Sequence, residues 1–111
     1  MRGPFLTDIQ MTWVWAILES LNQTYISTLL QLSDLYMLNK APEKAQAIWL
    51  RALGFDACLE EVHCLLMKNY AAQGDRLAVA RQYQSCKEAL RNELDISPSD
   101  ETNELYHQLM D

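Results

Sequence analysis

Glycine and proline are scarce in this chain, since each occurs only three times in 111 residues. A fold made of many short strands needs such residues at its turns, so their scarcity argues against a β-sandwich or a β-barrel. Half of the residues are hydrophobic, which is enough for a chain of this length to bury one core without disulfides or metals. Long, uninterrupted helices are therefore the predicted architecture.

Basic residues and long apolar runs are also in short supply. Nine Lys and Arg stand against fifteen Asp and Glu, giving a net charge of −6, and no basic cluster suits a phosphate backbone. We expect no direct binding of nucleic acid by this chain. The most apolar stretch, Met11 to Leu18, is shorter than the roughly 20 residues of a membrane-spanning helix. Met1 to Ile9 lacks the pattern of a signal peptide, so we expect a soluble, cytoplasmic chain with no membrane contact.

Residue types that carry chemistry are few and scattered. Cys58, Cys64 and Cys86 are odd in number and lack the short paired spacing of zinc ligands, so buried reduced thiols are predicted. His63 is predicted to be a packed, hydrogen-bonded core residue, and His107 a solvated surface residue. No nucleophile with a neighbouring base and no glycine-rich phosphate loop can be assembled. The sequence thus predicts no enzyme activity, no metal and no cofactor.

The first helix is predicted to be unusually long. From Asp8 to Asn39 there is no Gly or Pro, and apolar side chains recur at steps of three and four. Those side chains are Val14, Leu18, Leu21, Tyr25, Leu29, Leu32 and Tyr36. A second stripe of Ile26, Leu30 and Met37 lies beside the first, so this helix is expected to bury two sides. Its length favours a helical-repeat setting or a break near residues 22–24.

Capping residues predict four further helices. The starts are marked by Pro42, Asp56, Asp75 and Ser97-Pro98 with Asp100, and the ends by Gly54 and Gly74. Proline suits the first helical position, short polar side chains accept hydrogen bonds from the first turn, and glycine suits the position just after the end. The five predicted helices span about residues 9–39, 42–53, 57–73, 75–92 and 98–110.

A period of 34 residues is present in the chain. At this offset the size-matched pairs are Leu32 with Leu66, Tyr36 with Tyr70, Ala45 with Val79, Trp49 with Tyr83 and Ala52 with Cys86. The period and the order of residues resemble the tetratricopeptide repeat. Small side chains let the second helix of a pair lie close to the first, and Trp49 is expected to fill the gap between successive pairs.

These patterns predict one all-α, tetratricopeptide-like domain over residues 1–111, with about five helices in antiparallel pairs. We expect repeat one at about 26–59, repeat two at about 60–93 and a capping helix at about 98–110.

Short motifs along the chain resemble one bacterial family. In order, they are Gly3-Pro4-Phe5-Leu6, Trp13-Val14, Glu60-Glu61-Val62-His63, Leu66-Met67, Tyr70-Ala71, Gln82-Tyr83 with Cys86 and Leu90, Glu93-Leu94, Pro98, Thr102 and Leu105-Tyr106. Their combination and order resemble the bacterial transcriptional activator domain, as in regulators of the Streptomyces antibiotic regulatory protein type, over nearly the whole chain. The resemblance implies a non-catalytic role in transcription regulation through protein contacts.

The resemblance also implies partners. In that family the domain follows a DNA-binding winged helix, which this sequence does not include, so we expect an excised part of a longer regulator. The expected partners are that winged helix, other regulator domains or a second copy. After Trp13-Val14 the family tends to be rich in Arg and Glu, whereas this chain continues with Trp15-Ala16-Ile17-Leu18. This departure favours an apolar contact at the front of the first helix.

The first predicted binding surface contains the two early tryptophans. Trp13 and Trp15 are two residues apart and so point about 200° from each other on a helix. One of them is therefore expected to be exposed and to contact a partner. The alternative is that residues 3–6 fold back over it.

The second predicted binding surface is the concave side of the first helix in each repeat, where similar domains bind ligands. It would present Ser27, Leu30, Asp34 and Met37 from repeat one and Glu61, Cys64, Lys68 and Ala71 from repeat two. The alternative is that neighbouring helices of the same chain fill this groove.

Two functional classes stay open from the sequence. One is a regulatory interaction domain of a transcription activator. The other is a free-standing adaptor whose concave groove holds the tail of a partner protein. A winged helix encoded directly upstream would favour the first class.

Overall fold

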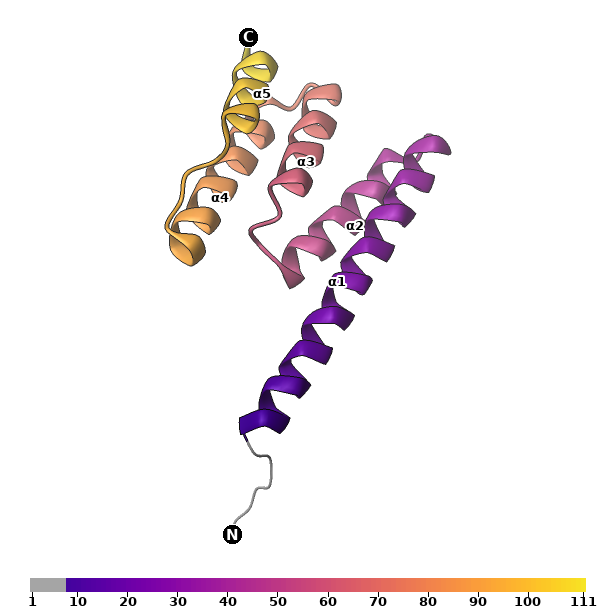
Figure 1. Cartoon of the computed structure of the whole chain (residues 1–111). Coiled ribbons are helices and arrows are strands. Elements are labelled where there is room, and N and C mark those ends of the chain that lie inside the picture. The colour runs from indigo at the N-terminus through magenta and orange to yellow at the C-terminus, as the bar shows by residue number, and fades with distance from the viewer. Residues whose placement is uncertain (1–7) are drawn as a thin grey trace.

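A computed structural model describes residues 8–111, which form five helices and no strand (Figure 1). The helices are α1 (Asp8–Leu38), α2 (Pro42–Phe55), α3 (Glu60–Ala72), α4 (Arg76–Leu94) and α5 (Asp100–Met110). The predicted all-α class is confirmed. Helix α1 is continuous, so the polar run at residues 22–24 does not break it. Residues 3–6, expected as a possible cap on the tryptophans, lie outside the described residues.

The helices are arranged in successive antiparallel pairs. Helix α1 pairs with α2 and α3 with α4, while α5 packs against both α3 and α4 (Figure 1). Helix α2 also contacts α3 and joins the two pairs, whereas the backbone of α1 packs against α2 alone among the described helices. This is the tetratricopeptide-like arrangement that the 34-residue period predicts, closed at one end by α5.

The two helix pairs turn in the same way. After α1, Lys40 adopts a left-handed backbone with φ 58°, and after α3, Gly74 does so with φ 78°. The N–H of Lys40 donates to the carbonyl of Met37 at 3.0 Å, and that of Ala41 to Tyr36 at 2.8 Å. The donors that follow α3 make the equivalent two bonds, 34 residues further on, at 2.9 and 3.0 Å. Both turns are left-handed C-caps, so the repeat extends to backbone hydrogen bonds.

The predicted boundary between the second and third helices is wrong. Helix α2 continues through Gly54 to Phe55 and has Asp56 as its C-cap. Its last turn continues because Phe55 gains a contact, with its ring edge-on to that of Tyr25 at 4.7 Å between centroids. The Asp56 carboxylate accepts from the N–H of Cys58 at 3.0 Å and so closes a turn instead of capping α3. Helix α3 therefore begins at Glu60.

The predicted start of the last helix is also wrong, by two residues. Ser99, and not Ser97, is the N-cap of α5, and its hydroxyl accepts from the N–H of Thr102 at 3.3 Å. The predicted cap of α4 is confirmed, because the Asp75 carboxylate accepts from the N–H of Ala78 at 3.0 Å.

The apolar core is centred on α2. Its buried cluster consists of Leu29, Ala45, Trp49, Ala52, Val62 and Leu66, from α1, α2 and α3. The two alanines lie one turn to either side of Trp49 and let α2 approach its neighbours closely. Trp49 is only 2% exposed, and its indole N–H donates to no described residue. Its contribution to the core is therefore volume and apolar surface.

Polar and aromatic contacts dock α5. The carboxylate of Glu60 accepts from the backbone N–H of Ser99 at 3.0 Å and from the hydroxyl of Thr102 at 2.7 Å. The ring of Tyr83 stacks on that of Tyr106 with centroids 3.9 Å apart. Partial burial acts to raise the pKa of Glu60, but these two hydrogen bonds outweigh it and hold the pKa below its ordinary value.

We predict that Trp49→Ala lowers the free energy of unfolding by about 3–5 kcal/mol, because it leaves a cavity between the helix pairs. Trp49→Phe is the matched control: it keeps an aromatic ring, leaves a smaller cavity and should therefore cost clearly less than Trp49→Ala. Urea denaturation followed by circular dichroism measures both. A Trp49→Ala variant with the wild-type midpoint would contradict the packing described above.

A second prediction concerns the docking of α5. Because the pKa of Glu60 is lower in the folded state, its carboxylate stabilises the fold above the unfolded pKa of about 4.3, and this stabilisation is lost as the pH falls through the folded pKa. Glu60→Gln should cost about 1–2 kcal/mol at neutral pH, with a gap to wild type that narrows below about pH 4.

The measurement is the urea midpoint of wild type and Glu60→Gln at neutral and acid pH. Glu61→Gln changes an exposed neighbour and should stay within about 0.5 kcal/mol of wild type throughout. A gap for Glu60→Gln that did not change with pH would rule out a role for its charge.

Candidate protein-binding surface

Helix α1 is much longer than the helix that covers it. With 31 residues against 14 in α2, it spans roughly 46 Å against roughly 21 Å. Helix α2 ends where Phe55 meets Tyr25, and the part of α1 before that point projects beyond the other helices (Figure 1). We refer to residues 8–24 as the overhang.

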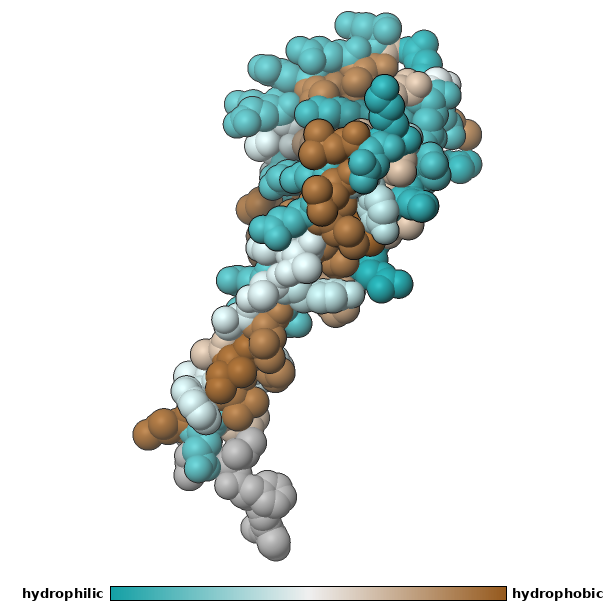
Figure 2. Space-filling view, turned by 90° about the vertical axis from the view of Figure 1, so that its right-hand side faces the viewer, coloured by the Kyte–Doolittle hydropathy of each residue, from teal (hydrophilic) through white to brown (hydrophobic). Residues whose placement is uncertain are grey.

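The first part of the overhang, residues 9–18, is mostly apolar and uncharged. No charged residue occurs between Ile9 and Leu18, and the space-filling view shows hydrophobic surface along this projecting part (Figure 2). Ile9 is 82% exposed, Trp13 67% and Trp15 65%. A helix that is hydrophobic all round is normally buried against other protein. The described part of the chain does not cover this surface.

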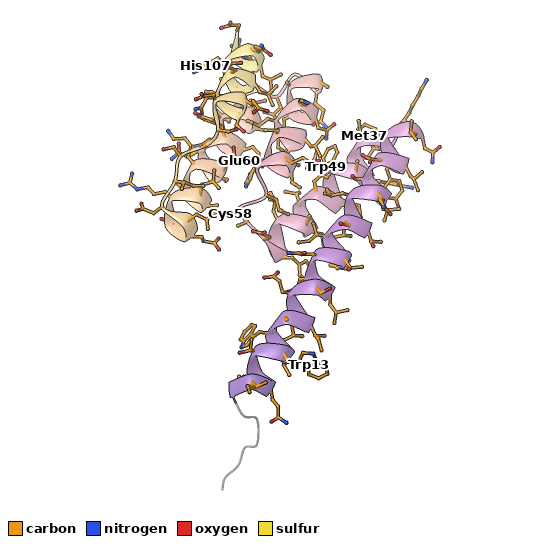
Figure 3. All side chains as sticks on the ribbon, in the orientation of Figure 1. Trp13, Met37, Trp49, Cys58, Glu60 and His107 are labelled. Carbon is orange, nitrogen blue, oxygen red and sulfur yellow. The ribbon has the colours of Figure 1, made fainter. Side chains whose placement is uncertain are left out.

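The overhang has two opposite faces. Met11, Trp15 and Leu18 continue, at steps of four and three, the stripe of α1 that α2 covers further along; we call this the core-side face. Ile9, Thr12, Trp13 and Ala16 form the outer face, which carries a shallow open hollow of about 450 Å³. Figure 3 shows Trp13 on the side of α1 that points away from the other helices.

At least one exposed tryptophan was expected, and the structure exposes both. Trp13 lies on the outer face, as the 200° argument allows. Trp15 lies on the core-side face but is also exposed, because α2 ends at Phe55 and does not reach it. Both side chains are therefore accessible to a partner.

The predicted concave surface is only partly open. Ser27 and Asp34 of α1 and Glu61 and Lys68 of α3 are exposed, as is Met37. The other predicted members are partly covered by the chain itself, and these are Leu30, Cys64 and Ala71.

Different neighbours cover two of these members, Leu30 and Cys64. Leu30 packs against the buried core cluster. The sulfur of Cys64 lies 3.4 Å from the Thr102 hydroxyl of α5, so α5 covers this part of the surface of α3. The structure does not gather the ten predicted residues into one site, because the two tryptophans lie on the overhang, four residues lie further along α1, and four lie on α3.

One hollow was not anticipated from the sequence. An open cavity of about 590 Å³ lies where α1 passes the end of α2 and the segment before α3. Its lining is Glu19, Asn22, Gln23, Ile26, Ser27, Phe55, Asp56 and Leu59. Of these residues, only Ser27 was predicted from the sequence to bind a partner. The hollow depends on where α2 ends, and the end of this helix was predicted too early from the sequence.

His63 lies in the core between α3 and α4. It is 2% exposed, its Nε2 bonds to the carbonyl of Ala57 at 2.8 Å, and its Nδ1 to the amide of Gln82 at 2.6 Å. The neutral ring satisfies both bonds by donating through Nε2 and accepting through Nδ1. Burial lowers the pKa of His63, which favours that neutral form.

The remaining groups of chemical interest are dispersed. Burial raises the pKa of the Cys86 thiol to about 12, and His107 lies exposed on α5 (Figure 3). Within residues 8–111 no group of three His, Cys, Asp or Glu side chains is placed to hold a metal ion. Among these same residues, no helix combines the length and apolar character needed to cross a membrane.

Comparison with known proteins bears on the motifs described above. The family profile described as the bacterial transcriptional activator domain matches residues 1–110. No curated protein and no solved structure gave a match. The profile covers both helix pairs, α5 and the overhang. The chain therefore belongs to the bacterial transcriptional activator domain family.

Proposed function

We propose that this transcriptional activator domain is a non-catalytic interaction module that acts through protein contacts with adjacent regulator domains, partner proteins or a second copy in the bacterial cytoplasm. All of residues 1–111 serve as one module, with repeats at about 26–59 and 60–93 and a cap at about 98–110. The observation that carries the proposal is the overhang, a largely apolar segment of α1 that no other described helix covers.

The overhang has the properties of a binding hot spot. Tryptophan is enriched among the residues that dominate binding energy, and Trp13 and Trp15 are both about two-thirds exposed. Burying a large apolar side chain contributes about 1.5–3 kcal/mol. Covering these two rings and Ile9 would therefore give a partner a substantial driving force without any charged contact.

The concave surface supplies a second, polar contact in this proposal. Ser27, Asp34, Glu61 and Lys68 are exposed there with charges of both signs, and Leu30 and Met37 add apolar surface beside them. A partner that covers the overhang and continues into the groove would gain orientation from these groups.

A free-standing peptide-binding adaptor is the second candidate function. The hollow beside Ser27 favours it, because its lining combines Phe55 and Ile26 with Glu19 and Asp56. Such a mixture suits an extended peptide with one apolar and one basic side chain.

The absence of catalysis in this proposal is supported by how the polar groups are used. Both ring nitrogens of His63 are engaged in structural hydrogen bonds. The carboxylate of Glu60 holds α5. Neither group is placed to take a proton from a substrate.

We predict that the chain, fused behind a heterologous DNA-binding domain, activates a reporter that carries the matching operator. A double change of Trp13→Glu and Trp15→Glu should reduce reporter output to near background, because losing one hot spot of about 2 kcal/mol weakens binding about 30-fold. Leu77→Glu on α4 is the matched control, since Leu77 is 61% exposed and lies away from the overhang.

Immunoblots and circular dichroism of the purified variants would verify equal amounts and equal helicity. Reporter output that was lost equally in the Leu77→Glu control, or retained in the double variant, would defeat the proposal that the overhang contacts the regulatory partner.

A further prediction separates protein contacts from DNA contacts. The isolated chain should show no affinity for duplex DNA in fluorescence anisotropy between about 50 and 200 mM salt, because a net charge of −6 provides no counterion release. Tight binding that weakens steeply over this range would contradict it.

A further inference from the structure

The geometry of the core-side face of the overhang favours one kind of binding partner. We propose that Met11, Trp15 and Leu18 pair with the same face of a second copy, the two α1 helices running antiparallel about a two-fold axis near Trp15. This inference rests on the proposed function, since both use the overhang, and it names the partner of one of its faces.

The shape of the molecule leaves room for this pairing. Helix α2 covers the core-facing stripe of α1 only as far as the contact between Phe55 and Tyr25. Beyond the end of α2, a helix of a second copy can pack along the same stripe. Figure 1 shows the other helices beside the C-terminal part of α1, so in an antiparallel pair those of the two copies would lie at opposite ends. Met11 then lies against Leu18 of the second copy, and Trp15 packs close to the axis.

The charge distribution favours self-pairing of this segment. No charged residue lies between Ile9 and Leu18, so no like charges meet along the core-side face although the whole chain carries −6. The nearest acid is Glu19. An antiparallel pair places Glu19 beside the uncharged residues around Met11 of the other helix, whereas a parallel pair would set the two Glu19 carboxylates against each other, which is unfavourable.

The area available matches a small but specific dimer. The exposed parts of Met11, Trp15, Leu18 and Leu21 amount to roughly 400 Å² of apolar surface per copy by typical side-chain areas. With flanking polar atoms, the total over both copies reaches the threshold of about 1,000 Å² for a specific interface. Interfaces at this lower limit are typical of weak, transient association, so we expect a dimer dissociation constant on the order of 10 μM.

Sedimentation velocity of the full chain at about 1–200 μM, a range that brackets this constant, tests the inference with two matched variants. Trp15→Glu alters the core-side face and Trp13→Glu the outer face, two residues away and with nearly the same exposure. We expect wild type and Trp13→Glu to form dimers, with dissociation constants within about threefold. Trp15→Glu should weaken the dimer by about 30-fold or more. Urea midpoints check that both variants keep the wild-type core.

Three results would overturn the pairing: a wild type that stays monomeric at the highest concentration, equal loss of the dimer in both variants, or loss only in Trp13→Glu. The reporter assay separates this inference from the proposed function. Reporter output that depends on the overhang in a chain that stays monomeric leaves the proposed function standing and removes the second copy. If the chain forms the dimer but changes in the overhang do not alter reporter output, the pairing is supported and the proposed function of the overhang is contradicted.

Discussion

The position of each helix depends on the close packing of α2 between α1 and α3. Ala45 and Ala52 have no exposed surface, and only side chains of this size allow three helices to converge around Trp49. Because the backbone of α1 packs against α2 alone, α2 connects α1 to the rest of the molecule. Its length of 14 residues therefore decides how much of α1 is covered and where the uncovered part begins.

The two helix pairs are stabilised by different means. The contacts between α1 and α2 are mainly apolar and aromatic, whereas α3 and α4 are also joined by the buried bond between His63 and Gln82. The side-chain amide of Asn69 donates to Gln46 at 2.9 Å and links α3 back to α2. Hydrogen bonds are directional, so they fix the relative register of helices that apolar contacts alone would allow to slide. With α5 docked on Glu60, two repeats suffice where an open solenoid needs more.

Much of the fold could be predicted from the sequence, because its signals are local. The 34-residue period and the Asp75 cap depend on residues near each other in the chain, and the structure keeps them. The helix boundaries were predicted wrongly where a contact between residues far apart in the sequence determines where a helix ends. Gly54 is compatible with either a helix end or a helix interior, and the ring of Tyr25, thirty residues earlier, favours the interior by holding Phe55.

The candidate surface was predictable in composition but not in extent. The apolar run from Trp15 to Leu18 indicated an exposed contact, yet periodicity places Trp15 on the stripe that faces the core. Whether such a residue is covered depends on the length of the neighbouring helix, a tertiary property. The groove shows the same limit, because Cys64 has the spacing of an exposed residue and is covered by α5.

The unequal lengths of α1 and α2 also divide one continuous helix into two parts of unequal stability. Beyond Tyr25 its amides are protected by tertiary packing and should exchange with solvent only when the whole domain unfolds. Within residues 8–111, α2 ends before it reaches the overhang, and the tryptophan, valine and isoleucine residues of the overhang have modest helix propensity. A segment of that length is marginal as a free helix. The helical order of the overhang is therefore coupled thermodynamically to the binding of a partner. Binding would slow amide exchange in the overhang before it changed the melting temperature of the core.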